Sequence, residues 1–263
     1  RTIRLRVSLV RLLQREIDAM FPFSRKRTLS EAGIFAGMTD WHSHILPGVD
    51  DGLESIGDSL EALREYEALG IREVWLTPHV MEDMPNTTEG LRERFAELRT
   101  AYSGPVELHL AAEYMMDSLL GERLRSGDLL PIGSEGRHLL VETSYFSPPA
   151  RLGGILDSVR SSGYYPVLAH PERYLYMDMK DYDVLTASGA ILQLNLPSLT
   201  GMYGSAVRKR ALRLLRAGLY TLAGTDLHRT AQAAGLASER CLDGTAAGRL
   251  SALVQNLNTL CTD

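Results

Sequence analysis

The sequence predicts a single-domain α/β protein in which short parallel strands alternate with helices. The chain has 263 residues, 44% hydrophobic and 23% charged, which is an ordinary globular composition with enough apolar material for a large core. Seven short β-rich runs are separated by segments with helical periodicity. Most of these helical segments end at a glycine, and a strand follows within a few residues, as in repeated βα units.

The predicted strands are spread over most of the chain. They are Thr39–Ile45, Glu73–Thr77, Val106–Ala112, His138–Glu142, Tyr165–Ala169, Ala190–Asn195 and Tyr220–Thr225. Their number and their apolar interiors favour a barrel, and an open doubly wound sheet is the alternative.

The predicted helices are defined by apolar periodicity and by their ends. They are Ile56–Leu69 closed by Gly70, Glu89–Tyr102 capped by Thr88, Asp117–Arg125 closed by Gly127, Gly153–Ser161 closed by Gly163, Val184–Ala187 closed by Gly189, and Ala206–Ala217 closed by Gly218. Leu250–Leu260 is expected to be a last amphipathic helix, whereas residues 230–247 are rich in Ala and Gly and have only a weak pattern. No apolar run approaches the roughly 18 residues of a membrane span.

Residues 1–37 are predicted to form a basic, helical extension before a main domain of residues 38–263. They contain eight basic and three acidic residues, whereas the rest of the chain contains 20 basic and 30 acidic residues. We expect the extension to pack on the main domain or on a partner chain, with contact to a membrane surface as the alternative. The acidic main domain argues against a nucleic-acid partner, because phosphates would be repelled.

The two cysteines indicate the cytoplasm as the compartment. Cys241 and Cys261 are too few for a disulfide framework, and neither lies near a histidine or a Gly-rich loop in the sequence. We therefore expect a reducing environment and no thiol nucleophile. If the basic extension binds lipid, the protein would lie at the inner face of the membrane.

Five of the seven histidines lie at or just beyond the carboxyl ends of predicted strands. They are His42, His44, His79, His170 and His228. Parallel α/β folds bind their ligands at this edge. Each histidine alone has an ordinary structural explanation, but burying five ionisable groups together would be costly without a compensating cation. The other two, His109 and His138, are expected to be structural.

Four carboxylates are expected at the same edge. They are Asp51 after the first strand, Glu113 after the third, Glu142 at the end of the fourth, and Asp226 in D-x-H. An unpaired carboxylate at the end of an apolar strand would be costly, so Glu142 is interpreted as a metal ligand. The other acids near Asp51 are interpreted as solvated surface, namely Asp50, Glu54 and Asp58. Mixed imidazole and carboxylate ligands suit Zn, Mn or Fe.

Six motifs occur in a fixed order between about Thr39 and Arg229. They are H-x-H-I-L-P-G-x-D-D-G, T-P-H, A-x-E, V-E, H-P-E-R-Y and D-x-H. Together they resemble the polymerase-and-histidinol-phosphatase (PHP) superfamily. The D-D-G loop and H-P-E-R-Y are most similar to its bacterial manganese-dependent protein-tyrosine phosphatases from capsule and exopolysaccharide operons. The resemblance implies a distorted seven-stranded, TIM-like (β/α)7 barrel.

The resemblance also implies three divalent metal ions, with Mn as the expected metal and Fe or Zn as alternatives. The first ion would be bound by His42, His44, Glu113 and Asp226. The second would be bound by Glu113, Glu142 and His170, and the third by Asp51, His79 and His228. The chain differs from the pattern after T-P-H, where relatives often have a second histidine and this chain has Val80.

The activity implied by the resemblance is hydrolysis of phosphotyrosine on a protein, namely the tail of a bacterial tyrosine autokinase that controls capsule or exopolysaccharide synthesis. Arg173, on the loop after the fifth strand, is expected to bind the phosphate as a catalytic residue. The alternative role for Arg173 is a structural ion pair with Glu172 or with another acid at this edge. Arg229 is the candidate for a second phosphate-binding arginine, and the oligomeric state stays open.

Three other functions remain as alternatives. The same site would hydrolyse a small phosphomonoester such as histidinol phosphate. An amidohydrolase-like barrel also begins with H-x-H and ends with Asp, but it usually has a bridging lysine where this chain has Glu142. The third alternative is a non-catalytic scaffold that is stabilised by metal and only binds a kinase tail, but it gives Arg173 no evident role.

Overall fold

Strands and helices alternate along the chain, and the paired strands are parallel. The computed structural model describes residues 26–255 and residue 260. Its strands are β1 (Thr39–Ser43), β2 (Glu73–Leu76), β3 (His79–Val80), β4 (Glu107–Leu110), β5 (Glu113–Met115), β6 (His138–Glu142), β7 (Tyr165–Leu168), β8 (Ile191–Asn195) and β9 (Leu222–Gly224). They form one sheet in the order β1-β2-β4 and another in the order β3-β5-β6-β7-β8-β9. The predicted single α/β domain with parallel strands is confirmed.

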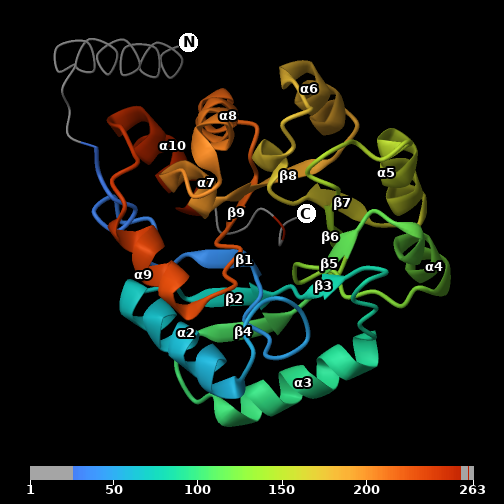
Figure 1. Cartoon of the computed structure of the whole chain (residues 1–263), viewed down its shortest axis with the longest axis horizontal. Helices are drawn as coiled ribbons and strands as arrows, with labels where there is room; N and C mark the ends of the chain where they lie inside the picture. Colours follow the sequence, from blue (N-terminus) through green and yellow to red (C-terminus); the bar gives the residue numbers. More distant parts are fainter. Residues whose placement is uncertain (1–25, 256–259, 261–263) are drawn as a thin grey trace, which may run out of the picture.

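Helices surround the outside of the curled strands (Figure 1). They are α2 (Ile56–Leu69), α3 (Thr88–Ala101), α4 (Ser118–Ser126), α5 (Leu152–Ser161), the 3-10 turn η1 (Pro171–Arg173), α6 (Met179–Ala187), α7 (Leu196–Thr200), α8 (Gly204–Ala217), α9 (Thr230–Ser238) and α10 (Gly244–Gln255). Within the described part of the chain, no helix is long and apolar enough to cross a membrane.

The structure has nine strands in its described residues, rather than the seven predicted, because two predicted strands are each followed closely by a short strand that pairs in the other sheet. Only Thr77 and Pro78 separate β2 from β3, and only Ala111 and Ala112 separate β4 from β5. Pro78 has no N–H to donate, so the first ladder is interrupted there. After each interruption the chain pairs in the other sheet. The additional strands begin at His79 and Glu113, two of the predicted ligands.

The first and last strands lie next to each other. The N–H of Asp226 donates to the carbonyl of His42 at 2.8 Å, and the N–H of His44 donates to the carbonyl of Leu227 at 2.9 Å. Gly224 makes this approach possible, because a Cβ at that position would lie 2.5 Å from the Cβ of His42. The contact brings the H-x-H and D-x-H motifs together from opposite ends of the domain.

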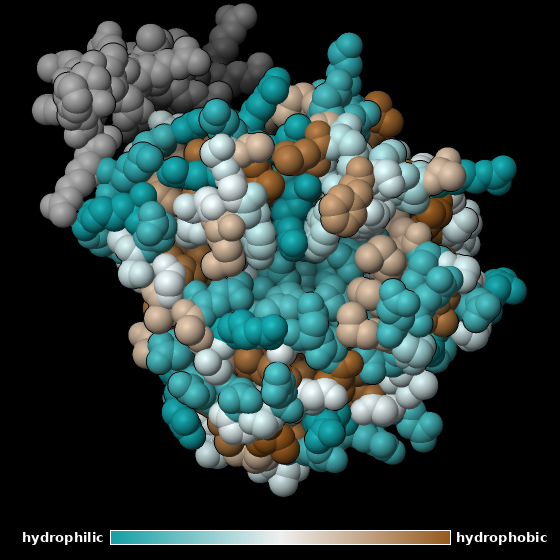
Figure 2. All heavy atoms as spheres, in the orientation of Figure 1, coloured by the Kyte–Doolittle hydropathy of each residue, from teal (hydrophilic) through white to brown (hydrophobic). Residues whose placement is uncertain are grey.

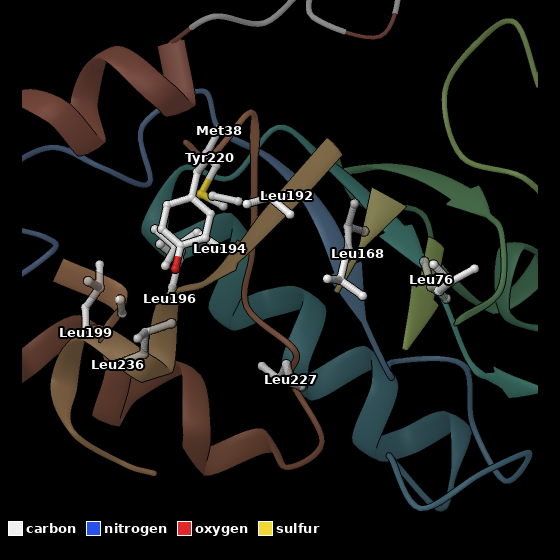
Figure 3. Close-up of a cluster of buried hydrophobic side chains, with 14 of the residues drawn as sticks. Met38, Leu76, Leu168, Leu192, Leu194, Leu196, Leu199, Tyr220, Leu227 and Leu236 are labelled. Atoms are coloured by element: carbon white, nitrogen blue, oxygen red, sulfur yellow. The ribbon is translucent and has the colours of Figure 1, made fainter. Parts of the chain in front are cut away.

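Apolar side chains pack on both faces of the strands. The larger cluster lies between strands and helices, and part of it is shown in Figure 3. On β6, Leu139 and Val141 belong to this cluster, whereas Leu140 belongs to a smaller cluster on the other face. Side chains alternate along a strand, so Glu142 shares the face of Leu140 and lies beside apolar neighbours.

Several helical regions differ from the sequence predictions. Helix α10 begins at Gly244, before the predicted start at Leu250, and α3 is capped by Thr87 rather than by Thr88, which is its first residue. The weakly patterned residues 230–247 contain α9, which buries only Ala233 and Leu236 and therefore has little amphipathic periodicity. Helix α6 starts five residues before the predicted segment, because Asp178 caps it and accepts hydrogen bonds from two backbone N–H groups. The 3-10 turn and α7 were not predicted.

Residues 26–37, the described end of the predicted extension, form turns rather than a helix. Gly33 and Gly37 have positive φ angles of 69° and 73°, which a continuous helix does not allow. Leu29, Ile34 and Phe35 are buried in the main core. The segment after Thr28 therefore contributes to the core, while the helical pattern of residues 3–20 lies outside the described residues.

We expect Phe35→Ala to lower the free energy of unfolding by about 3–5 kcal/mol, because it would leave a cavity in the core. Denaturant unfolding measures this change. Val184→Ala is the control, since Val184 is 68% exposed, and it should change stability by less than about 0.5 kcal/mol. Equal stability of the two variants would contradict a structural role for residues 28–37.

Candidate metal centre

All nine predicted ligands converge at the carboxyl edge of the strands. Seven of them are buried, His228 is half-buried and Asp51 is exposed. Their ligand atoms form four overlapping groups, within each of which all atoms lie within 4.8 Å of one another. The groups are His42 with His44 and Asp226, His42 with Glu113 and His170, His79 with Glu113 and Glu142, and His44 with Asp51, His79 and His228.

Glu113 lies at the centre of the cluster. Its Oε1 is 3.0 Å from Nε2 of His170, and its Oε2 is 3.2 Å from both Nε2 of His42 and Nδ1 of His79. Strand β5 positions this carboxylate directly beside His79, its register partner on β3. Glu113 therefore belongs to two of the four groups of potential ligands.

The motifs of the first and last strands form one end of the cluster. Nε2 of His42 and Nε2 of His44 are 3.1 Å apart, and both lie near Oδ1 of Asp226, at 3.6 and 3.4 Å. At the other end, Oδ1 of Asp51 lies 3.5 Å from Nε2 of His79 and 3.3 Å from Nε2 of His228.

Two histidines are oriented by hydrogen bonds at Nδ1. Nδ1 of His42 is 3.1 Å from Oε1 of Gln193, and Nδ1 of His44 is 2.7 Å from Oδ2 of Asp50. These acceptors hold the proton on Nδ1 and leave Nε2 free to face the cluster. Histidine metal ligands are commonly oriented in this way.

Two further histidines have the same arrangement. Nδ1 of His228 donates to the carbonyl of Asp226 at 2.9 Å, and Nδ1 of His170 lies 3.2 Å from the hydroxyl of Tyr174. Each of these imidazoles directs Nε2 toward the carboxylates. His79 has both ring nitrogens near carboxylates of the cluster, with Nε2 3.5 Å from Oδ1 of Asp51 and Nδ1 3.0 Å from Oε1 of Glu142.

The interpretation of Asp50 as solvated surface is wrong. Its side chain is fully buried, and besides contacting His44 it accepts hydrogen bonds from the N–H groups of His79 and Gly52. Gly52 allows this loop to fold back, because a Cβ there would lie 2.3 Å from the carbonyl oxygen of His44.

Gln193 and Asn195 are functional candidates that sequence reasoning missed. Gln193 also accepts a hydrogen bond from the N–H of His170, and Nδ2 of Asn195 donates to Oδ2 of Asp226 at 2.6 Å. Two polar residues at alternate positions of an otherwise apolar strand were a signal for them, since such residues share one face.

The backbone is strained at two of the predicted ligands. Within the described residues, His170 and Asp226 are the only non-glycine residues with positive φ, at 35° and 50°. This conformation costs about 1–3 kcal/mol per residue and persists only where surrounding contacts enforce it. Strain at these two positions is typical of a functional site.

Opposite charges shift the pKa values of the buried groups. Burial lowers the pKa of His42, but the carboxylates of Glu113 and Asp226 outweigh burial and raise it to about 9. Burial raises the pKa of Glu113, yet His42 and His79 hold it well below its usual range. Contact with His228 lowers the pKa of Asp51 to about 2. The carboxylates therefore stay ionised, and metal ions can replace the protons that balance them.

One contact directly tests whether the cluster fits metal ions. Nδ1 of His79 and Oε1 of Glu142 are buried and 3.0 Å apart, yet neither atom makes a hydrogen bond to any described residue. Buried polar atoms without partners are rare and costly. Metal ions bound at these two atoms would satisfy them, so the residues present fit a metal site.

Both predicted arginines line the cavity above the cluster. This cavity has a volume of about 530 Å³. Nη1 of Arg173 lies 3.2 Å from Oδ2 of Asp226, so the alternative of an ion pair with an acid other than Glu172 occurs in the structure. Nη1 of Arg229 donates to the carbonyls of Asp51, Gly52 and His228. Figure 2 shows a hydrophilic hollow near the centre of this face.

The histidines predicted to be structural lie elsewhere. His109 stacks on Trp75 with ring centroids 4.6 Å apart, and its Nε2 lies 3.0 Å from Oε1 of Glu73. His138 packs against the ring of Tyr165. Neither belongs to a group of potential metal ligands.

The fold and this cluster define an α/β protein with a candidate multi-metal site at the carboxyl edge of its strands. Residues 38–243 match the family model for capsular polysaccharide synthesis, CpsB/CapC, and the chain belongs to this family. The resemblance to the tyrosine phosphatases of capsule operons is thereby confirmed.

Two tyrosine phosphatases are among the proteins with similar sequences. Tyrosine-protein phosphatase YwqE of Bacillus subtilis is 29% identical over 197 residues, which cover 73% of this chain and 77% of YwqE. Tyrosine-protein phosphatase CpsB of Streptococcus pneumoniae is 29% identical over 204 residues, which cover 73% of this chain and 83% of CpsB.

The fold is similar to that of a chain from the crystal structures of YwqE from Bacillus subtilis and CpsB from Streptococcus pneumoniae, unique metal-dependent tyrosine phosphatases. The TM-score is 0.67 and the identity is 25%. The match covers 82% of this chain and 95% of that chain. The curled parallel α/β architecture is therefore shared with these enzymes.

We expect Asp50→Asn to weaken binding of Mn²⁺ about 10- to 100-fold, because the amide is a poorer hydrogen-bond acceptor for His44. Titration calorimetry of the metal-stripped protein measures this. Glu54→Gln, an exposed change in the same loop, is the control and should bind Mn²⁺ as the wild type does. Unchanged affinity in Asp50→Asn would contradict the role of Asp50 in orienting His44.

Proposed function

We propose that the chain is a metal-dependent protein-tyrosine phosphatase. The observation that carries this proposal is the convergence of five imidazoles and four carboxylates beneath a cavity lined by two arginines. Imidazole and carboxylate ligands bind divalent ions, and arginine binds phosphate oxygens through two parallel N–H groups. The tyrosine phosphatases named above support phosphotyrosine as the substrate.

We propose three ions, with Mn²⁺ first and Fe or Zn as alternatives. The ligand sets are His42, His44, Glu113 and Asp226; Glu113, Glu142 and His170; and Asp51, His79 and His228. The distances around Glu113 and Asp226 support the first two sets, and those around Asp51 support the third. When bound, such ions supply Lewis-acid stabilisation of the phosphoryl oxygens and an activated water.

Arg173 is proposed as a catalytic residue that orients the phosphate. Its guanidinium carbon lies 4.0 Å from the ring centroid of Tyr145 and 4.2 Å from that of Tyr203, so two aromatic faces hold it in one plane. Its charge faces the cavity above Asp226. This fixed position suits the equatorial oxygens of a phosphoryl group during in-line displacement.

Arg229 is proposed to contact the phosphate from the opposite loop. Its three hydrogen bonds to backbone carbonyls all use Nη1. The side chain thereby ties the loop containing Asp51 to the end of the last strand. Both the position of Arg229 in the cavity lining and this anchoring support a role in the site.

A thiolate mechanism is not part of the proposal. Cys241 is 2% exposed, and burial raises the pKa of its thiol to about 11. It does not line the cavity. The described residues therefore offer no ionised thiol near the arginines.

We propose that the protein substrate is the phosphorylated tail of a bacterial tyrosine kinase in capsule or exopolysaccharide synthesis. The family supports this choice. The proposed setting is the cytoplasm at the inner face of the membrane, with residues 1–37 as the candidate contact.

We also propose that the two sheets form one distorted seven-stranded barrel, in which β2 with β3 and β4 with β5 each count as a single strand.

Chelation of the purified protein should abolish hydrolysis of a phosphotyrosine peptide, and Mn²⁺ should restore it, because bound ions would supply the activated water. Metal analysis before and after chelation, together with phosphate release, tests this. Histidinol phosphate serves as the small comparison substrate. Full activity in protein shown to be free of metal would overturn the proposed function.

Arg173→Ala should retain its metal and its fold but lose roughly 10²-fold in kcat/KM, the effect of removing one preorganised donor. Arg173→Lys should recover only part, since lysine lacks the planar fork. Arg213→Ala, an exposed change on α8, is the matched control. If Arg173→Ala keeps wild-type turnover, Arg173 does not orient the phosphate, and Arg229 becomes the candidate for that role.

A further inference from the structure

We propose that Met81, Met84 and Met115 form a methionine wall that receives the aromatic ring of the substrate and selects aryl over alkyl phosphate esters. This inference rests on the proposed phosphatase function and identifies residues that recognise the leaving group. All three methionines line the same cavity as the ligands and Arg173. All three are partly exposed, so their side chains are accessible from the cavity.

Strand geometry directs two of these methionines to the site. Met81 follows His79 by two residues and Met115 follows Glu113 by two residues, so each shares a face with a proposed ligand. His79 pairs in register with Glu113, and the next pair along the two strands is Val80 with Tyr114. This intervening pair is buried and belongs to the main core.

The third methionine is positioned by a tight turn. Met81 and Met84 form an antiparallel bridge, in which each N–H donates to the carbonyl of the other at 3.1 and 3.0 Å. On the other side, Met115 pairs in register with Glu142. The methionine wall therefore lies immediately beyond the proposed ligands, at the position where the leaving group of a bound phosphate ester would project.

The wall differs chemically from the rest of the cavity. Carboxylates and imidazoles form one region, and Arg173 with its flanking tyrosines Tyr145 and Tyr203 forms another. A phosphate held by Arg173 and the ligand cluster would leave its ester group against the three thioethers. Thioethers are flexible and polarizable and make favourable contacts with aromatic rings. A hydroxylated alkyl group would bury polar atoms there without hydrogen-bond partners.

The test compares phenyl phosphate with glycerol phosphate as substrates of the metal-loaded protein. In the double variant Met81→Gln/Met115→Gln, we expect the ratio of the two kcat/KM values to fall about tenfold. The loss should appear mainly as a higher KM for phenyl phosphate, because ring contacts act equally in the ground state and the transition state. The double variant Met81→Leu/Met115→Leu should restore most of the ratio.

The control is Met202→Gln, since Met202 is 52% exposed and does not line the cavity. It should keep the wild-type ratio. Metal content and thermal unfolding of each variant distinguish an altered wall from a lost metal or a disturbed fold. A double glutamine variant that binds metal normally and keeps the wild-type ratio would overturn the proposal.

A binding measurement separates this inference from the proposed function. Phenylphosphonate and inorganic phosphate are titrated into the metal-loaded protein, and the glutamine variant should lose about tenfold more affinity for phenylphosphonate than for phosphate. If the wild type hydrolyses neither ester, the proposed function is wrong, but this titration still tests the methionine wall. Equal changes in the two affinities would overturn it.

Discussion

The fold is organised around the burial of opposite charges at one edge of its strands. Glu113 lies within 3.2 Å of three imidazoles, and each of those imidazoles touches a second carboxylate. Such a cluster is stable only if protons on the imidazoles or bound cations balance its carboxylates. Several local features keep these groups together. Gly224 lets β9 approach His42, and Gly52 lets the acidic loop fold over His44. The strained backbones of His170 and Asp226 are maintained for the same purpose.

The alternation of side chains along a strand connects this cluster with the rest of the molecule. Leu140 and Glu142 share one face of β6, so the charged site lies next to an apolar layer that excludes water. By the same alternation, Met81 shares a face with His79, and Met115 shares a face with Glu113. Strand β5 and the residue after β3 thus follow a candidate ligand with a methionine that lines the cavity. The same alternation of side chains therefore accounts for the positions of both the candidate ligands and the methionines.

Local patterns in the sequence predicted most of the site but not its supporting contacts. The motifs H-x-H and D-x-H were expected at the carboxyl ends of strands, and all nine predicted ligands meet at one edge. The positive φ angle of Asp226 in D-x-H is not predicted by the alternation of side chains in a strand. Asp50 was missed because its role depends on a loop that folds back onto His44, which no local pattern records. Strands β3 and β5 were missed because they are short and begin where the chain changes sheets. Helix α9 was missed because its alanines give no contrast between faces.

The contact between the first and last strands also limits when the site can exist. His42 lies in β1 and His44 directly follows it, whereas Asp226 and His228 lie just after β9. A chain emerging from the ribosome therefore cannot complete the cluster until almost the whole domain has been synthesised. A chain that ends before Asp226 lacks the carboxylate that groups with His42 and His44. We therefore expect incomplete products of this gene to bind metal ions weakly, because the candidate ligands come from strands along nearly the whole domain.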